Sequence, residues 1–131
     1  MVKLTIGDME RVRFCDFELI TEGKHYTYDT LRKLKQKCSH NFYWVMGSDI
    51  LHQIQTLYGY EHLKKEANFI VFHRTNYPVI DAGVNVEAVI DFESDNISST
   101  KVRERVKKGK SISDLVPKAV EEYILRNNLY R

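Results

Sequence analysis

Phe-Tyr-Trp-Val-Met-Gly-Ser-Asp, residues 42–49, is the stretch of this sequence that decides the fold. Its first five residues form an unbroken apolar run, which is typical of a strand covered on both faces. The run ends at a turn of one glycine and two polar residues, and helical sequence through Leu51 and Ile54 follows. A buried strand that passes directly into a helix is the repeating unit of an α/β domain.

Further strands are expected on both sides of this stretch. Residues 69–72 form a second apolar run, and apolar residues alternate from Val84 to Phe92. Residues 11–20 also predict a strand, although their alternation slips near Cys15-Asp16.

Helical periodicity lies between and after these strands. A helix is expected from Thr27, its candidate cap, and a basic, exposed helix from residues 99–110. Pro117 suits the first position of a last helix. This alternation predicts one α/β domain over residues 1–131 with a mainly parallel sheet.

Composition narrows the classes of function. The chain has 131 residues, of which 43% are hydrophobic and 29% charged, with a net charge of +2. It has no apolar run of membrane-spanning length and no signal peptide, so we expect a cytoplasmic protein without a membrane partner. The mild charge gives no reason to expect a nucleic-acid partner. Neither the five histidines nor Cys15 and Cys38 have the spacing of a metal site, so none is expected.

Three polar clusters lie at the predicted junctions between strands and helices. They are Tyr26–Thr30, Gly47–Asp49 and Ile97–Arg103. In parallel sheets ligands bind beyond the carboxyl ends of the strands, where such junctions lie. We therefore expect the three clusters to gather at one ligand-binding edge.

Each cluster has two interpretations. Hydroxyl residues at the start of a helix can bind phosphate with Arg103 one turn further on, or Ser98 or Ser99 can simply cap that helix. Asp49 can accept hydrogen bonds from a ribose, or Ser48 or Asp49 can be an N-cap. The Tyr26–Thr30 cluster can belong to the ligand-binding edge, or it can cap its helix and have no other role. Arg74, at the end of a strand, is either solvated or bound to an anion.

Five segments, in this order, resemble one enzyme family, the nicotinate-nucleotide adenylyltransferases. Residues 25–31 are similar to the family's SYTxDTL segment, with histidine in place of serine. Residues 45–49 resemble a strand that ends in Gly-x-Asp, and residues 69–74 resemble a buried strand that closes on arginine. Residues 97–103 match the ISSTxxR signature, and residues 116–130 resemble the C-terminal signature.

The resemblance implies a Rossmann-like nucleotidylyltransferase fold and an enzyme of NAD biosynthesis. Such enzymes join ATP and nicotinate mononucleotide with Mg²⁺, forming deamido-NAD and pyrophosphate. Carried over by position, the mononucleotide site implied is Thr27, Leu57, Tyr58 and Arg74. The ATP site implied is Gly47, Asp49, Ile97, Ser98, Ser99 and Arg103.

Two departures from the family pattern affect these expectations. Leu57-Tyr58 stands where the family has Trp-Tyr, and leucine offers no aromatic face for a pyridine ring. The sequence also contains no HxGH or TxGH motif, and Met1–Leu4 matches a helix from the middle of the family's domain. We therefore expect a fold truncated at its N-terminus, with no catalytic residue in this chain.

Two expectations follow from the missing N-terminal segment. The chain alone is predicted to be inactive, because the histidine loop of that segment neutralises charge on the ATP phosphates. The absent strands would leave sheet edges exposed, so either the strands of residues 11–20 and 42–46 close directly on each other or two chains pair across the gap. Of these two arrangements we favour the homodimer. The alternative is a catalytically silent remnant that binds nucleotide or serves as an interaction module. A phosphopantetheine-specific relative is disfavoured by the segment of residues 26–31.

Overall fold

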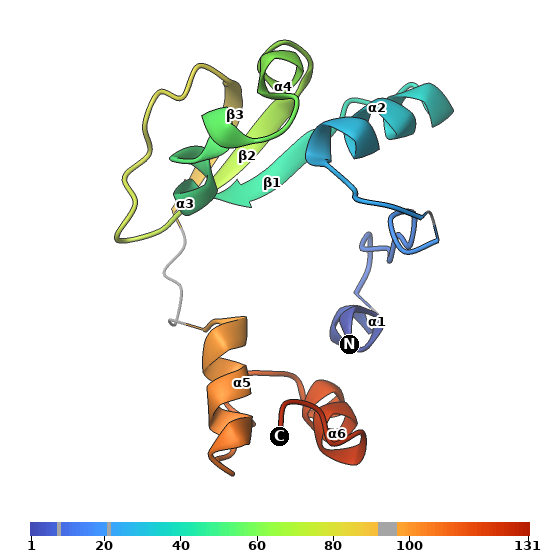
Figure 1. The fold of residues 1–131 in the computed structure, drawn as a ribbon, viewed down its shortest axis with the longest axis vertical. Coiled ribbons are helices and arrows are strands. Elements are labelled where there is room, and N and C mark those ends of the chain that lie inside the picture. The colour runs from blue at the N-terminus through green and yellow to red at the C-terminus, as the bar shows by residue number, and fades with distance from the viewer. Residues whose placement is uncertain (8, 21, 92–96) are drawn as a thin grey trace. The chain divides into compact units, whose positions relative to one another are not determined.

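A computed structural model describes residues 1–7, 9–20, 22–91 and 97–131 of the chain. The chain forms two compact units (Figure 1). The terminal unit combines Met1–Phe17 with Asp95–Arg131, and the central unit is Glu18–Ser94. That all 131 residues form one domain stays a prediction.

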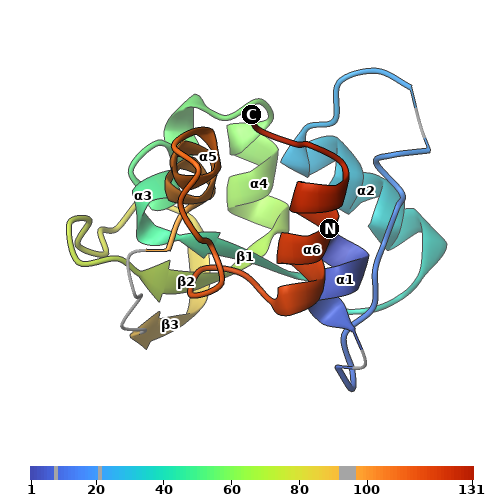
Figure 2. The same cartoon turned by 90° about the horizontal axis from the view of Figure 1, so that it is seen from below.

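The central unit is built on a three-stranded parallel sheet of order β1-β2-β3. Its strands are β1 (Tyr43–Gly47), β2 (Asn68–His73) and β3 (Asn85–Asp91), and Figure 2 shows them side by side. The prediction of an α/β fold with a parallel sheet is confirmed. The three strands lie where the apolar runs predicted them, although Phe92 is outside the described residues.

One face of the sheet carries the core of the central unit. Phe69 and Val71 of β2 are 1% and 0% exposed, because they point towards the helices. The helical elements are α2 (Thr27–Lys37), α3 (Ser48–Leu51), the 3-10 helix η1 (Ile54–Thr56) and α4 (Tyr60–Glu66). The core consists of Leu31, Met46, Leu51, Ile54, Leu63, Ala67, Phe69, Val71 and Ala82.

The expected burial of β1 on both faces is wrong. Met46 is buried and Trp44 packs against the core, whereas Tyr43 and Val45 are 44% and 56% exposed. Since alternate residues of a strand point to opposite faces, the core of the central unit covers only the Trp44 and Met46 side.

The start of α2 differs from its prediction in one detail. Tyr26 is the N-cap and Thr27 is the first helical residue, and no side chain caps the helix. The prediction of Thr27 as a cap is therefore wrong. The helix is held by burial of Thr30 and Leu31. The Thr30 hydroxyl also donates a hydrogen bond to the Glu18 carboxylate.

The strand predicted over residues 11–20 is wrong. This segment consists of turns and irregular backbone, and Arg11 has a φ of 63°, outside the range of a strand. Leu19 and Ile20 are 76% and 72% exposed. A strand persists only where a neighbour satisfies its backbone groups, and none of the described strands pairs with this segment.

The terminal unit is helical, with α1 (Val2–Ile6), α5 (Ser99–Lys107) and α6 (Lys118–Arg126). Helix α5 ends earlier than predicted, and Pro117 is the N-cap of α6 rather than its first residue. The core of this unit consists of Val102, Ile112, Leu115, Val120 and Ile124.

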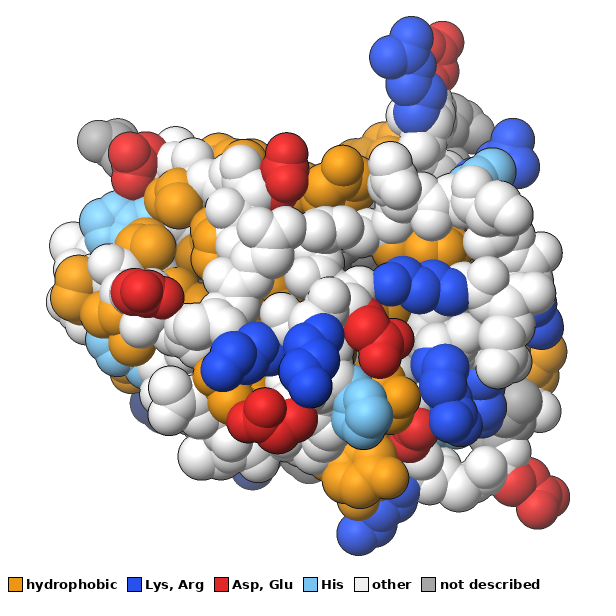
Figure 3. Space-filling view, turned by 90° about the horizontal axis from the view of Figure 1, so that it is seen from above, with side chains coloured by type: hydrophobic (Ala, Val, Ile, Leu, Met, Phe, Trp, Pro, Cys, Tyr) orange, Lys and Arg blue, Asp and Glu red, His pale blue; other side chains and the backbone are white. Residues whose placement is uncertain are grey.

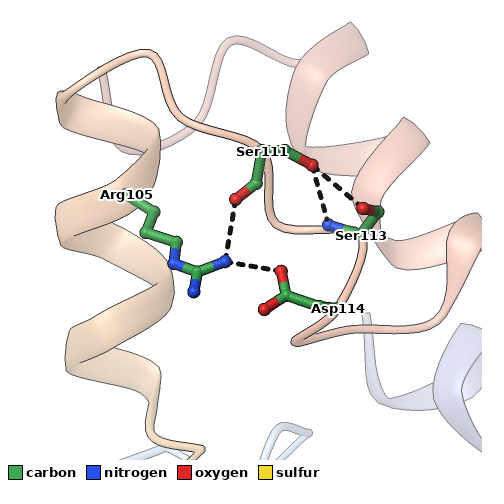
Figure 4. A network of polar contacts seen from close by, with 4 residues as sticks. All are labelled: Arg105, Ser111, Ser113 and Asp114. Carbon is green, nitrogen blue, oxygen red and sulfur yellow. Dashed lines mark hydrogen bonds and ion pairs between the residues drawn. The ribbon is translucent and has the colours of Figure 1, made fainter.

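A polar network fixes the loop that follows α5 (Figure 4). Arg105 donates to the Ser111 carbonyl oxygen at 3.2 Å and to the Asp114 carboxylate. The hydrogen bond from Arg105 lowers the pKa of Asp114 below its usual value of 3.8. This loop is therefore tied to the helix through an ionised carboxylate.

Two features of the chain concern its surroundings, namely the side chains on its surface and the length and polarity of its helices. Figure 3 shows a face on which basic, acidic and hydrophobic side chains are interspersed. Within the described ranges, no helix is both long enough and apolar enough to cross a membrane.

Candidate nucleotide site

The carboxyl ends of β1 and β2 meet at one edge of the sheet, because the two strands are parallel. Gly47 ends β1 and pairs in register with Phe72, two residues before Arg74. Helix α3 starts directly after Gly47, so Asp49 lies in its first turn. The structure thus brings Gly47, Asp49 and Arg74 together.

Asp49 and Arg74 form an ion pair, a contact that sequence reasoning did not predict. Arg74 Nε lies 3.1 Å from Asp49 Oδ1, and the two side chains are 59% and 26% exposed. Oδ1 itself is covered and has no aligned hydrogen-bond donor among the described residues. We interpret the contact as an ion pair without hydrogen-bond alignment. The second Asp49 oxygen and the terminal Arg74 nitrogens, which carry most of its N–H groups, can still bind a ligand.

Gly47 allows this ion pair to lie close to the backbone. A Cβ atom at this position would lie 2.7 Å from Arg74 Nε and would also overlap Asp49 Oδ1. The φ of Gly47 is −80°, which any residue can adopt, so the need for glycine here is steric rather than conformational.

Ser48 is a fully buried polar residue whose role the sequence did not reveal. Its hydroxyl donates to the Tyr77 carbonyl oxygen at 2.6 Å and accepts from the Arg74 backbone N–H at 2.9 Å. The N-cap of α3 is Gly47, so the interpretation of Ser48 or Asp49 as a cap is wrong. Ser48 instead ties the start of α3 to the segment after β2 and so positions Arg74.

The predicted mononucleotide residues form a second group in the central unit. Thr27 and Leu57 are half-buried and Tyr58 is exposed. The ring of Tyr58 lies 4.4 Å, centroid to centroid, from that of Tyr26 at the start of α2. The segments of residues 26–27 and 57–58 are therefore adjacent, as a shared site requires.

The third cluster lies at the start of α5 in the terminal unit. Ser98 is its N-cap and accepts a hydrogen bond from the Lys101 backbone N–H at 3.2 Å, as the capping interpretation requires. Ile97, Ser99 and Arg103 are exposed. Ser99 and Arg103 also line an open cavity of about 250 Å³ whose other walls include Val102, Val120 and Ile124. That all three polar clusters gather at one edge stays a prediction.

Comparison with known proteins identifies a family model and a related protein that match the chain. Residues 1–105 match the model of the cytidylyltransferase-like family. A protein of Shouchella clausii (strain KSM-K16) named probable nicotinate-nucleotide adenylyltransferase is 39% identical over 132 residues, which cover 99% of this chain and 67% of that protein.

Two solved structures of Plasmodium falciparum nicotinic acid mononucleotide adenylyltransferase have a similar fold. The complex with APC has a TM-score of 0.71 and 26% identity, covering 83% of this chain and 60% of the other. The complex with NaAD has a TM-score of 0.70 and 26% identity, and the match covers 82% of this chain and 58% of the other. The chain therefore spans about three fifths of the length of these enzymes.

Proposed function

Because this chain belongs to the nicotinate-nucleotide adenylyltransferases within the cytidylyltransferase-like family, we propose that it is such an enzyme of NAD biosynthesis or a fragment of one. In the reaction, a phosphate oxygen of nicotinate mononucleotide attacks the α-phosphorus of ATP. The new P–O bond yields deamido-NAD, and the bond to the β-phosphate breaks to release pyrophosphate. No covalent enzyme intermediate is needed, so catalysis rests on alignment and neutralisation of charge.

The observation that carries this proposal is the grouping of Gly47, Asp49 and Arg74 at the carboxyl ends of β1 and β2. This is the edge where parallel α/β sheets bind nucleotides. Gly47 and Asp49 contact the adenosine of ATP, where a carboxylate can accept hydrogen bonds from ribose hydroxyls. Arg74 lies beside the mononucleotide and donates N–H groups to its phosphate.

The remaining mononucleotide contacts come from two adjacent segments. Backbone N–H groups near Thr27 and Tyr58 bind the nicotinate carboxylate, and Leu57 lies against the ligand. The contact between the Tyr26 and Tyr58 rings supports this assignment because it holds the two segments together.

In the terminal unit, the start of α5 binds ATP phosphates through Ile97, Ser98, Ser99 and Arg103. The N-terminus of a nine-residue helix offers free N–H groups and a favourable dipole for an anion. Arg103 lies one turn into the helix and is exposed, so its guanidinium is available to a phosphate.

Mg²⁺ enters this scheme with ATP. Within the described part of the chain, no group of three or more His, Cys, Asp or Glu side chains could hold a metal ion. Mg²⁺ commonly keeps several waters and binds substrate phosphates rather than an all-protein cage. The ion is therefore part of the substrate, and it neutralises phosphate charge.

The environment and assembly of the chain belong to the same proposal. We place the protein in the cytoplasm, with ATP and nicotinate mononucleotide as its ligands and with no nucleic-acid or membrane partner. A homodimer covers the edge of β1 that pairs with no described strand, beside the face on which Tyr43 and Val45 are exposed. Light scattering coupled to gel filtration checks this point, and a monomer at every concentration would contradict it.

The test of the proposed function separates binding from turnover. In ¹⁵N NMR titrations of the 131-residue chain, nicotinate mononucleotide should shift Thr27, Tyr58 and Arg74, and Mg-ATP should shift residues 47–49 and 97–103. Pyrophosphate release should stay at background, because no HxGH motif is present to neutralise the phosphates. If neither ligand binds, the proposal fails in favour of an interaction module. Turnover within tenfold of an intact enzyme would contradict the predicted inactivity.

A further inference from the structure

Two tyrosines from separate elements form an exposed aromatic surface beside α2. Tyr26 immediately precedes this helix and Tyr58 follows η1, yet their ring centroids are 4.4 Å apart with an angle of 34° between the ring planes. The two residues are 39% and 58% exposed. Each ring therefore covers part of the other and still presents aromatic surface to solvent.

The backbone around Tyr58 is held in place by a second aromatic contact. Gly59 has a φ of 76°, and a Cβ atom there would lie 2.8 Å from the Tyr28 side chain. The Tyr28 ring also stacks on His62 of α4 at 4.6 Å. The segment after η1 thus packs closely against the first turn of α2, so the tyrosine pair is formed before any ligand binds.

Leu57 has a different role. It is half-buried and packs against the core cluster that includes Ile54 and Leu63. An aliphatic side chain held in this way adds apolar contact but offers no π face. The aromatic surface of this segment comes from the neighbouring Tyr58 instead.

We propose that the Tyr26–Tyr58 pair is the surface on which the pyridine ring of nicotinate mononucleotide stacks. The ring nitrogen of this ligand is bonded to ribose, which makes the ring an electron-poor pyridinium. The electron-rich face of a tyrosine attracts such a ring through stacking and through a cation–π term. Tyr26 and the Tyr58 side chain are therefore specificity-determining residues, and Leu57 is not.

This inference rests on the proposed function, and its test uses the 131-residue chain in binding experiments. In the wild type, the pyridine protons of bound nicotinate mononucleotide should move upfield and show NOEs to the Tyr26 and Tyr58 ring protons. Tyr58→Leu and Tyr26→Leu should each weaken binding about threefold to tenfold, the range expected for one aromatic contact. Tyr58→Phe should bind within about twofold of the wild type because the ring is retained.

The controls separate this inference from the function on which it rests. Tyr123→Leu, at a tyrosine in α6 that is 42% exposed, should leave binding unchanged. Mg-ATP affinity should be unchanged in every variant, and Trp44 fluorescence reports whether the central unit is folded. Binding by the wild type without these NOEs, or unweakened binding by both folded leucine variants, overturns the inference alone. Absence of any mononucleotide binding by the wild type overturns the proposed function and the inference together.

Discussion

Ser48→Ala should destabilise the central unit without touching its apolar core. The Ser48 hydroxyl serves two backbone groups, the Tyr77 carbonyl at 2.6 Å and the Arg74 N–H at 2.9 Å, and the residue is fully buried. Alanine fits the space but leaves a donor and an acceptor without their partner. A buried polar group that loses its partner costs roughly 1–3 kcal/mol. We therefore expect the free energy of unfolding to fall by about 2–3 kcal/mol.

The assay is urea unfolding followed by the fluorescence of Trp44. This residue is the chain's single tryptophan and lies in β1, so the signal reports the central unit. Small domains have urea m-values of about 1 kcal/mol per molar, so the midpoint should fall by about 2–3 M. Ser39→Ala, at an exposed serine, is the matched control and should change the stability by less than about 0.5 kcal/mol.

Two outcomes would refute this reasoning. If Ser48→Ala stays within about 0.5 kcal/mol of the wild type, the two hydrogen bonds contribute nothing net. If the loss is large but the Arg74 amide keeps its chemical shift, Ser48 stabilises the fold without positioning Arg74. The expected result is a loss of stability together with a shift of that amide.

Three further predictions test the nucleotide site and the terminal unit. Gly47→Ala should displace the Arg74 side chain and separate the ion pair, but the free energy of unfolding should fall by less than about 1 kcal/mol, because this exposed side chain can move away; an intact pair in a crystal structure of the variant would contradict this. Asp114 should titrate below 3.8 in NMR and return towards that value in Arg105→Gln. Because its folded pKa is lowered, this carboxylate stabilises the loop above the unfolded pKa, and its contribution is lost as pH falls through the folded pKa. Arg103→Ala should weaken pyrophosphate binding about tenfold in calorimetry, and unchanged affinity would count against a phosphate site at α5.

The apolar patterns located the three described strands, although they did not predict the burial of β1. Residues 69–72 are apolar on both faces, and β2 is the central strand of the sheet, with a neighbour on each side. The alternation from Val84 to Phe92 likewise located β3, which lies at the edge. In both cases the pattern of side chains was sufficient to locate the strand. Because β2 and β3 pair with each other, their backbone groups also find partners.

Residues 11–20 show where this reasoning fails. Their alternation of apolar side chains resembled that of β3, but no described strand pairs with them and Arg11 has a positive φ. Pairing joins residues that are distant in sequence, and periodicity within a segment carries no information about its neighbour. A strand that is predicted from periodicity alone, with no partner strand identified, is therefore less reliable than one predicted within a series of alternating strands and helices.

Part of the candidate site could be predicted from the sequence. The rule that ligands bind at the carboxyl ends of parallel strands pointed to the Gly47–Asp49 cluster among three clusters, and Arg74 was a separate candidate at the end of a strand. The structure brings Gly47, Asp49 and Arg74 together. Their ion pair was not predicted, because it joins residues 25 positions apart. The role of Ser48 is hidden from local sequence for a similar reason, since its hydrogen-bond partners lie beyond β2.

The proposed role of the Tyr26–Tyr58 pair concerns how an interaction can be kept when a motif residue is replaced. Aligned by position, Leu57 marks the loss of an aromatic ring from the family pattern. A ligand responds to an aromatic face in space, however, and not to the position in the sequence that supplies it. In this chain, the rings of Tyr26 and Tyr58 lie in contact, and Tyr58 directly follows Leu57. Preference for a pyridine ring can therefore survive the substitution, provided that Tyr26 and Tyr58 remain in contact.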